Sequence, residues 1–370
     1  MQEQAPDFGF WDCSELPQED EEPVEEEFCM QILGNFVFVG FLGKGAYGLV
    51  SKVAFAEIQN SAYAIKVSEL KEAVQGLKVG CALNDLLDGG TGIFVRTYGW
   101  LLCASVTGNW TQVIKKSAPL NSAMANEDPL AFTLMDYNTN TFSDDDLMLF
   151  EDDYLNLMFH ILHGLYVARK RLQFSHEDLH GSNIMLVAVK PGKKTTLEID
   201  GKYYSVPFKR FSPRLIDYDL SLVGSREEEI TEEDYSDYSE DLFENSISDE
   251  ESGSPPSSSD LNSLMYAFIN KAESSGDVQV ASTLRSLKNS RAFQKASQEN
   301  RFQYDALGKL MMDPIFADLR QPINIGAPIH KCTVCSADAT HQWENSRWSF
   351  CGEDCASSLS HLAPSLKNKR

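Results

Sequence analysis

Hydrophobic and polar residues follow the period of strands in the first part of this chain and the period of helices later. From about Ile32, residues 36–39 and 63–67 form short runs rich in β-branched and aromatic side chains, which is typical of strands. Residues 68–87 and 152–172 repeat apolar positions about every 3.6 residues, which predicts two helices, the second long and largely buried. The pattern therefore predicts a β-rich first part and a helical second part.

Two stretches show neither period. Residues 1–27 mix Glu, Asp, Pro and Gln, which predicts a disordered acidic arm. Residues 225–259 are first acidic and then rich in Ser and Pro, which predicts a flexible insertion inside a folded domain. Helical patterning resumes at Asp260, so the folded domain is expected to continue after the insertion.

The formal net charge of -23 comes from these two stretches. Residues 1–27 hold 11 of the 55 acidic residues and residues 227–251 hold 13, so 31 acidic residues face 32 Lys and Arg in the rest of the chain. The folded body is therefore close to neutral. The acidic tracts either steer a basic substrate or partner to the protein or keep the chain soluble, and solubility is the simpler interpretation.

No stretch reaches 18 uncharged apolar residues, so no membrane span is predicted. The N-terminus is acidic and has no basic region, which argues against a secretory signal. The chain is therefore expected to be intracellular, in the cytoplasm or nucleus, or in a host cell or virion if it is viral. In a reducing compartment its 8 cysteines are not expected to form disulfides, and Cys81 and Cys103 are interpreted as small core residues.

Residues 43–48 read G-K-G-A-Y-G and lie between strand-like segments. In a kinase, such a hairpin lets backbone N–H groups approach the nucleotide phosphates, and a lysine on the next strand contacts the α and β phosphates. Lys66 follows the last of these glycines by 18 residues and fits that lysine. The alternative is an ordinary glycine hairpin with a surface lysine, whereas a dinucleotide-binding fold would place a helix directly after the glycines. The residues expected to contact a nucleotide are Gly43, Lys44, Gly45, Gly48, Val50 and Lys66.

The next segment with catalytic character carries His176, Asp178 and Asn183 in the pattern H-x-D-x-x-x-x-N. Phosphoryl transfer uses an acceptor for the proton of the substrate hydroxyl and, close by, an amide oxygen for a metal ion, roles that Asp178 and Asn183 fit. Asp217 follows a predicted buried strand and offers a carboxylate for Mg²⁺ at the phosphates. An Asp after a strand can simply cap a turn, but four motifs in kinase order favour the catalytic interpretation.

These motifs together carry a family resemblance. Asp178-Leu179-His180 with Asn183, and Asp217-Tyr218-Asp219 where many kinases have Asp-Phe-Gly, resemble the haspin-like serine/threonine protein kinases, and similar chains occur in large DNA viruses. The resemblance covers about residues 30–320. It implies an α+β, bilobal protein-kinase-like fold, ATP with Mg²⁺, and transfer to Ser or Thr of a protein substrate. It also suggests that Asp260 braces the catalytic loop, with a plain helix N-cap as the alternative.

Three positions depart from the usual kinase pattern. Glu177 stands where many kinases carry Arg, so an activation-loop phosphate would lose its usual partner. His180 replaces a lysine two residues after the catalytic Asp, so a fixed positive charge is missing there. No glutamate is evident as the partner of Lys66. Alignment to the related chains puts Gln75 or Gly76 at the expected position. Glu72 lies one helical turn earlier and is either that partner or a surface residue.

Two other functions fit the same residues. Small-molecule kinases of the aminoglycoside and choline type share the H-x-D-L-H-x-x-N motif, and Asp219 resembles their second acid, but these enzymes often lack a complete glycine loop. A non-catalytic pseudokinase scaffold is favoured by the missing glutamate and by His180. The intact catalytic residues count against that scaffold.

The C-terminal segment contains Cys332-x2-Cys335 and Cys351-x3-Cys355, a spacing typical of zinc sites. Two such pairs can close a tetrahedral site in a unit too small to have its own core, and the second pair resembles treble-clef fingers such as the MYM type. Zn²⁺ is therefore predicted to be structural, with four unrelated free cysteines as the alternative. The unit lacks a dense basic stripe, so we expect it to dock a protein rather than nucleic acid, and we expect a monomer.

The predicted organisation has six segments. They are an acidic arm at 1–29, an N-lobe with hinge at 30–141, a C-lobe part with the catalytic loop at 142–224, an acidic Ser-rich insertion at 225–259, the remainder of the C-lobe at 260–325, and a zinc-binding unit at 329–370.

Overall fold

The fold is described from a computed structural model. The structure describes residues 8–14, 16–18, 21–45, 48–56, 58, 61–87, 92–144, 146–190, 192–224, 259–299 and 303–322, with short strand pieces at 330–331, 338–339, 341–342 and 349–350. The chain divides into two compact units, one of Met1–Leu197 with Val206–Leu319 and one of Glu198–Ser205 with Arg320–Arg370. Within the described ranges no helix is long and apolar enough to cross a membrane.

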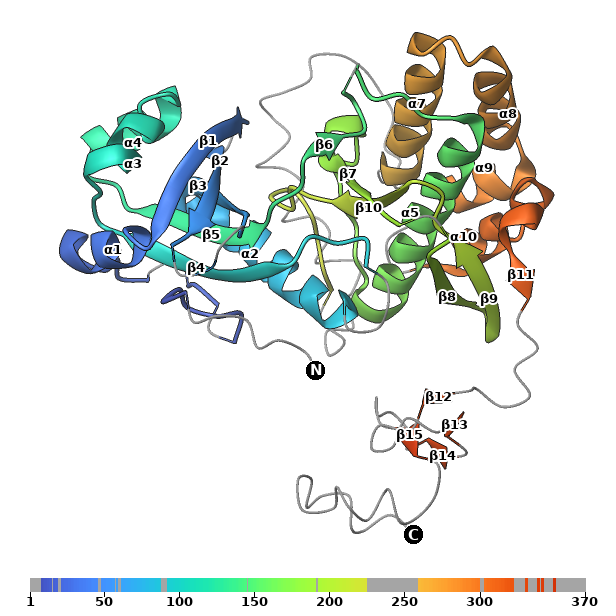
Figure 1. Cartoon of the computed structure of the whole chain (residues 1–370), viewed down its shortest axis with the longest axis horizontal. Coiled ribbons are helices and arrows are strands. Elements are labelled where there is room, and N and C mark those ends of the chain that lie inside the picture. The colour runs from blue at the N-terminus through green and yellow to red at the C-terminus, as the bar shows by residue number, and fades with distance from the viewer. Residues whose placement is uncertain are drawn as a thin grey trace, which may run out of the picture. The chain divides into compact units, whose positions relative to one another are not determined.

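The first part of the larger unit is a five-stranded antiparallel sheet in the order β1-β2-β3-β5-β4 (Figure 1). Its strands are β1 (Phe36–Lys44), β2 (Gly48–Phe55), β3 (Tyr63–Glu69), β4 (Thr97–Cys103) and β5 (Leu130–Asp136). The runs predicted as strands, 36–39 and 63–67, lie in β1 and β3, so both predictions are confirmed. Lys66 lies in the middle strand of the sheet, opposite Val50 of β2 and Thr133 of β5.

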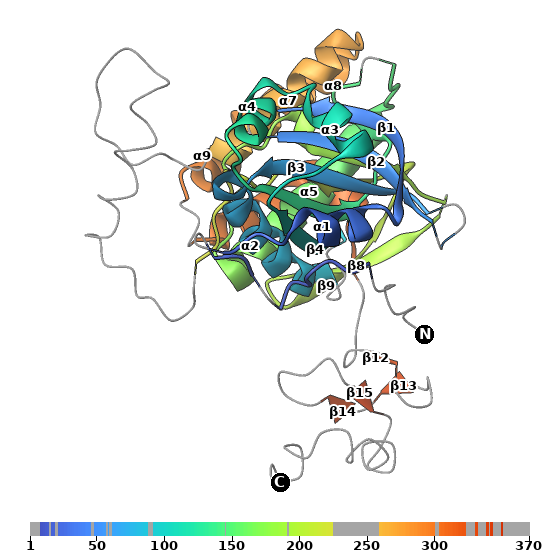
Figure 2. The ribbon, with the colours of Figure 1, turned by 90° about the vertical axis from the view of Figure 1, so that its left-hand side faces the viewer.

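Helices cover both faces of this sheet, because successive side chains of a strand point to opposite sides. On one face α2 (Leu70–Leu86) packs Leu77 and its neighbours against Trp100 and Leu102 of β4. The intervening residue Leu101 belongs to the core on the other face, which three further helices complete (Figure 2). These helices are α1 (Glu26–Leu33), α3 (Gly108–Ile114) and α4 (Ala118–Ala125). The helix predicted over 68–87 is thus confirmed as α2.

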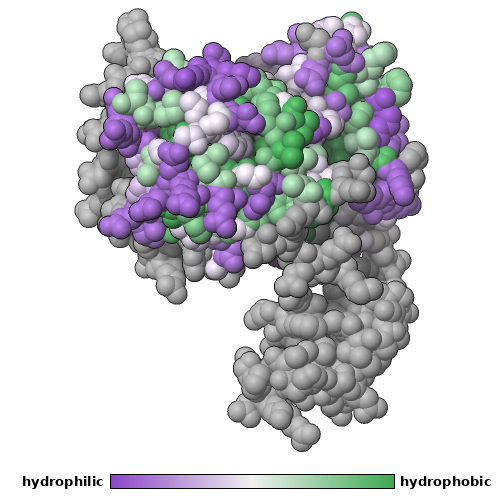
Figure 3. Space-filling model, turned by 60° about the vertical axis from the view of Figure 1, so that its left-hand side comes forward, coloured by the Kyte–Doolittle hydropathy of each residue, from purple (hydrophilic) through white to green (hydrophobic). Residues whose placement is uncertain are grey.

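The edge strand β1 keeps several apolar side chains at the surface. Val37 and Val39 are 56% and 52% exposed, and Nζ of Lys116 lies 5.0 Å from the ring centroid of Phe41. Figure 3, which brings the side of the sheet forward, shows hydrophobic surface between hydrophilic side chains. Because β1 leads directly into the glycine-rich hairpin, apolar surface borders that hairpin.

The second part of the larger unit is built around α5 (Glu151–Leu172), which confirms the long helix predicted over 152–172. Its core-facing side chains are fully buried, with Tyr154, Phe159 and Leu165 at 0% exposure. The other helices of this part are η2 (Gly181–Asn183), α7 (Ser259–Ser274), α8 (Val278–Lys288), α9 (Arg291–Ser297), α10 (Asp305–Met311) and η4 (Pro314–Leu319). Helix α7 begins where the sequence predicts that helical patterning resumes.

A small sheet in the order β10-β7-β6 lies next to the segments that the sequence predicts to be catalytic. Its strands are β6 (Asn140–Thr141), β7 (Ile184–Ala188) and β10 (Phe211–Leu215). Strand β7 begins directly after Asn183, and β10 ends two residues before Asp217. The antiparallel register places Ile184 opposite Leu215, so both polar residues come to the same end of this sheet.

Strands β8 (Lys194–Ile199), β9 (Lys202–Pro207) and β11 (Gln321–Pro322) form a further sheet. Two short antiparallel pairs follow, β12 (His330–Lys331) with β13 (Asp338–Ala339) and β14 (His341–Gln342) with β15 (Ser349–Phe350). The predicted zinc ligands Cys332, Cys335, Cys351 and Cys355 lie outside the described residues, as do residues 225–258 of the predicted insertion. Both features therefore stay predictions.

The predicted disorder of residues 1–29 is wrong for the part of this arm that the structure describes. Trp11 exchanges two backbone hydrogen bonds with Trp100, each 2.9 Å from N to O, and Phe8 packs among aromatic rings of the sheet with 6% exposure. Residues 26–29 form the first turn of α1. The prediction relied on average composition, which does not show single contacts. A few widely spaced apolar side chains attach this segment to the sheet, while its described acidic residues remain at or near the surface.

The expectation that the cysteines of this chain form no disulfides is also wrong for four of them. Cys13 forms a disulfide with Cys81 of α2, and Cys29 of α1 forms one with Cys103 of β4, with Cα atoms 5.2 and 5.8 Å apart. The partners are separated by 68 and 74 residues, so no local spacing pairs them. They meet because the N-terminal arm packs against the sheet and α2. Cys81 and Cys103 are buried as predicted, but as halves of disulfides.

Candidate active site

Lys66 connects the sheet to the segment that follows β10. Its Nζ lies 2.7 Å from Oδ1 of Asp217 and also forms an ion pair with Asp219, and its side chain is 14% exposed. The two acids lie 151 and 153 residues further along the chain. One largely buried ammonium group therefore stands between two carboxylates.

The glycines of the β1–β2 hairpin differ in how much space surrounds them. A Cβ added to Gly43 or Gly45 would meet no described atom within 4 Å, so the backbone there is open to a ligand. A Cβ added to Gly48 would lie 2.4 Å from the carbonyl oxygen of Val67, so the close approach of β2 and β3 requires this glycine. The hairpin tip at 46–47 lies outside the described residues.

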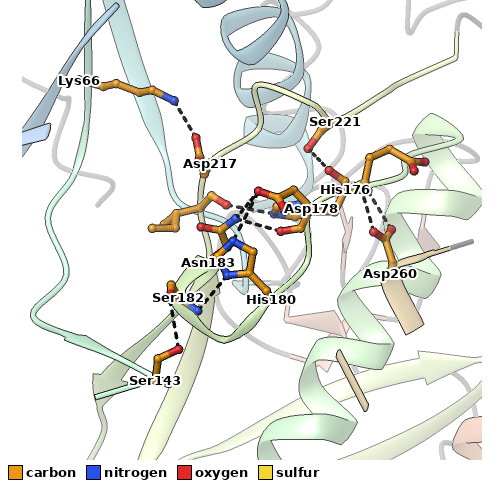
Figure 4. A network of polar contacts seen from close by, with 12 residues as sticks. Lys66, Ser143, His176, Asp178, His180, Ser182, Asn183, Asp217, Ser221 and Asp260 are labelled. Atoms are coloured by element: carbon orange, nitrogen blue, oxygen red, sulfur yellow. Dashed lines mark hydrogen bonds and ion pairs between the residues drawn. The ribbon is translucent and has the colours of Figure 1, made fainter. Parts of the chain in front are cut away.

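Residues 176–183, predicted from the sequence to be the catalytic loop, place Asp178 and Asn183 side by side (Figure 4). The amide nitrogen of Asn183 donates to the backbone carbonyl oxygen of Asp178 at 2.9 Å and to its Oδ2 at 3.1 Å. Because both bonds use the nitrogen, the amide oxygen of Asn183 remains to bind a ligand. The side chain of Asp178 is 41% exposed, so an incoming hydroxyl group can reach it.

His180 lies beside the same carboxylate. Its Nε2 is 3.5 Å from Oδ2 of Asp178, and its Nδ1 accepts a hydrogen bond from the backbone N–H of Ser182 at 3.2 Å. Because Nδ1 accepts, a neutral ring carries its proton on Nε2 and directs that N–H toward Asp178. The imidazole thus provides a donor where many kinases have a lysine.

Asp260 of α7 holds the backbone of the catalytic loop. Its carboxylate accepts hydrogen bonds from Oγ of Ser175 at 3.2 Å and from the backbone N–H groups of His176 and Glu177 at 2.8 and 2.9 Å. It is fully buried and pairs with the equally buried Arg169 at 3.9 Å. Glu177 has a φ of 61°, a left-handed conformation that these bonds stabilise. Asp260 therefore braces the loop, as the sequence resemblance suggests.

Asp217 follows β10 in the same left-handed region, with a φ of 66°. The backbone N–H of Ile216 donates to the carbonyl oxygen of Asn183 at 3.1 Å, which ties this segment to the catalytic loop. The Asp217 side chain is 41% exposed and points toward Lys66 (Figure 4). Unusual backbone conformations of this kind are concentrated at functional sites, where the direction of a side chain matters.

The charges around Lys66 do not balance, because one ammonium group serves two carboxylates. Burial by itself lowers the pKa of Lys66, but the charges of Asp219 and Asp217 outweigh it and raise that pKa. Burial also raises the pKa of Asp219; Lys66 opposes this shift and Asp217 adds to it. The excess negative charge favours binding of a cation next to these groups.

The donor set fits Mg²⁺ held together with a nucleotide. Mg²⁺ takes oxygen ligands and is usually bound by one or two protein groups, with phosphates and water completing its coordination. The carboxylate of Asp217 and the amide oxygen of Asn183 come to the same end of the small sheet. Among the described residues, no group of three His, Cys, Asp or Glu side chains has the arrangement to hold a metal ion by itself. The two oxygen ligands would therefore hold Mg²⁺ only together with phosphates and water.

No protein-family model matches the chain. Part of the chain is similar to a viral kinase. Over 74 residues it is 43% identical to "Probable kinase 098L" of Invertebrate iridescent virus 3, which covers 20% of this chain and 14% of that protein. The chain thus matches only a small part of its relative's length. The crystal structure of the PF14_0431 kinase domain is 17% identical with a TM-score of 0.30 and covers 52% of each chain.

The predicted catalytic residues form one series of contacts. Lys66 pairs with Asp217, the residue before Asp217 bonds to Asn183, and Asn183 bonds to Asp178. Among the predicted nucleotide-binding residues, Lys44 is exposed at the end of β1 and Val50 lies opposite Lys66.

The suggestion that Glu72 pairs with Lys66 is corrected by the structure. In the described part of the chain, Lys66 pairs with Asp217 and Asp219 and not with Glu72. Asp219 lies against α2 at Gly76, one helical turn after Glu72, and its carboxylate forms the ion pair with Lys66 instead. Sequence reasoning missed Asp219 as the partner, and its only signal was a second acid two residues after Asp217.

Proposed function

We propose that this protein is an ATP-dependent, haspin-like protein kinase that transfers the γ-phosphoryl group of ATP to Ser or Thr of a protein substrate. The observation that carries this proposal is the linked set of Lys66, Asp217, Asn183 and Asp178, which three separate segments contribute. The partial match to a viral kinase supports the same activity.

Each member of the set has a chemical role that follows from its surroundings. Asp178 accepts the proton of the substrate hydroxyl as its oxygen attacks. Lys66 and the open backbone at the β1–β2 hairpin bind phosphate oxygens. Asn183 and Asp217 would hold Mg²⁺, which supplies charge neutralisation at the phosphates when it is bound. Asp260 keeps the loop that carries Asp178 in place.

A transfer assay with radiolabelled ATP and Mg²⁺ tests this function. The acceptors are histones, casein, aminoglycosides and choline, and a sample without acceptor reports autophosphorylation. Label on Ser or Thr of a protein supports the proposal, whereas label only on a small molecule would replace it with the small-molecule kinase. ATP binding without transfer to any acceptor would favour the scaffold. The resemblance of Asp219 to the second acid of small-molecule kinases is weakened by its 10% side-chain exposure and its ion pair with Lys66.

The four C-terminal cysteines are proposed to hold one structural Zn²⁺. Because Cys332, Cys335, Cys351 and Cys355 fill a tetrahedral site, no position remains for substrate. Metal analysis of the full chain is expected to find about one zinc per chain. Cys335→Ser should release the metal and leave transfer to a small peptide unchanged, with Ser336→Ala as the control that retains it. A zinc-free wild-type chain, or loss of peptide phosphorylation on zinc release, would contradict this.

A further inference from the structure

The segment after β10 lies directly against helix α2, at two glycines one turn apart. A Cβ added to Gly76 would lie 2.6 Å from Oδ1 of Asp219 and 3.6 Å from its Cα. A Cβ added to Gly80 would lie 2.5 Å from Oγ1 of Thr97 and 3.6 Å from the ring of Tyr218. The space that a side chain at position 76 would need is therefore filled by the Asp219 carboxylate.

This arrangement matters because of the partner that Lys66 requires. In protein kinases the corresponding lysine pairs with a glutamate of the helix that follows its strand, and this pair must be in place for catalysis. Here that helix is α2, which offers Gln75 and Gly76 at the expected position. Gln75 donates its amide N–H to the carbonyl oxygen of Ser221 at 2.6 Å, so it is engaged with the segment after β10 rather than with Lys66.

We infer that Asp219 is the positioning residue that replaces the helix glutamate, and that Gly76 is its complement because a side chain at position 76 would push the Asp219 carboxylate out of this position. The inference rests on the proposed function. Lys66 is then held by the same short segment that carries the metal-binding Asp217, so its position depends on the docking of residues 217–219 on α2.

Exchanging the two positions tests this inference. Asp219→Gly is expected to lower kcat/KM on the order of 10- to 100-fold, because it removes a charged partner of Lys66. Adding Gly76→Glu to Asp219→Gly supplies a glutamate from the helix and is expected to recover most of that loss. A swapped variant that folds but is no more active than Asp219→Gly would overturn the inference.

A smaller substitution keeps the test decisive if the swapped variant does not fold. Gly76→Ala alone should lower activity by displacing Asp219, although helix propensity by itself favours alanine. In the Asp219→Gly background the same change should cause no further loss, and Gly92→Ala, where an added Cβ meets no described atom within 4 Å, is the matched control. Equal losses from Gly76→Ala in both backgrounds would contradict the inference.

A thermal-unfolding cycle without nucleotide separates this inference from the proposed function. The Tm shifts of Lys66→Met and Asp219→Asn should fail to add in the double variant by about 2 °C or more, because the two side chains form one pair. If the wild-type chain transfers no phosphate, the proposed function fails while this cycle still decides the pairing. Additive Tm shifts would overturn it. A change confined to the Mg²⁺ concentration needed for activity would make Asp219 a metal ligand instead.

Discussion

Asp178→Asn is expected to lower the rate of phosphoryl transfer by about 10²–10⁴-fold, because an amide cannot accept the proton of the attacking hydroxyl. The substitution keeps the shape of the side chain, and its amide oxygen can still accept the hydrogen bond from Asn183. Nucleotide binding and thermal stability should therefore stay close to wild type. The measurement is a single-turnover rate with saturating ATP, together with the Kd for ATP.

Asp152→Asn is the matched control for this prediction. Asp152 is 73% exposed and pairs with Lys209 at 3.0 Å, away from the catalytic loop, so its neutralisation should leave the rate unchanged. The role of Asp178 would be refuted if both asparagine variants transferred phosphate at the wild-type rate. A variant of Asp178 that no longer binds ATP would instead point to a structural defect in the loop.

Asp260→Ala is expected to reduce the free energy of unfolding by about 3–5 kcal/mol, because it removes the carboxylate paired with the buried Arg169. It also leaves the N–H groups of His176 and Glu177 without their acceptor. Urea unfolding measures the loss of stability, and hydrogen exchange should accelerate at these two amides. Activity should fall with it, since the loop that carries Asp178 loses its support.

Two further variants check that the cause is the buried charge. Replacing exposed Asp152 with alanine should change stability by less than about 0.5 kcal/mol. Combining Asp260→Ala with Arg169→Met removes both charges and should be less destabilising than the sum of the single changes. Strict additivity of the two single changes would show that the pair is not coupled.

Local patterns were enough to predict the elements that form the site. Asp178 and Asn183 are five residues apart, so their contact lies within one loop and can be anticipated from the sequence. The helix over 68–87 and the long helix over 152–172 were predictable for the same reason, since an apolar period reports which face of a helix is buried. The strand at 63–67 placed Lys66 correctly within the sheet.

The N-terminal arm shows where composition fails as a guide. Its many acids predict disorder, yet Phe8 and Trp11 bind it to the sheet, and Cys13 and Cys29 cross-link it. An average over a window does not weigh a few well-placed apolar contacts against many solvated charges. The pairing of cysteines has the same limitation, because spacing along the chain carries no information on which pairs meet.

The sequence by itself determined the order of the predicted catalytic motifs and the main helices, because each depends on neighbouring residues or on a regular period. The bracing of the loop by Asp260, 84 residues after His176, was suggested only by the family resemblance. Only the tertiary structure decided the partner of Lys66. The nearest acid on the following helix was the natural choice, but Asp219, 153 residues away, occupies the place because Gly76 leaves space for it. Such a contact depends on how two elements pack against each other, and no local pattern of either element records the distance between them.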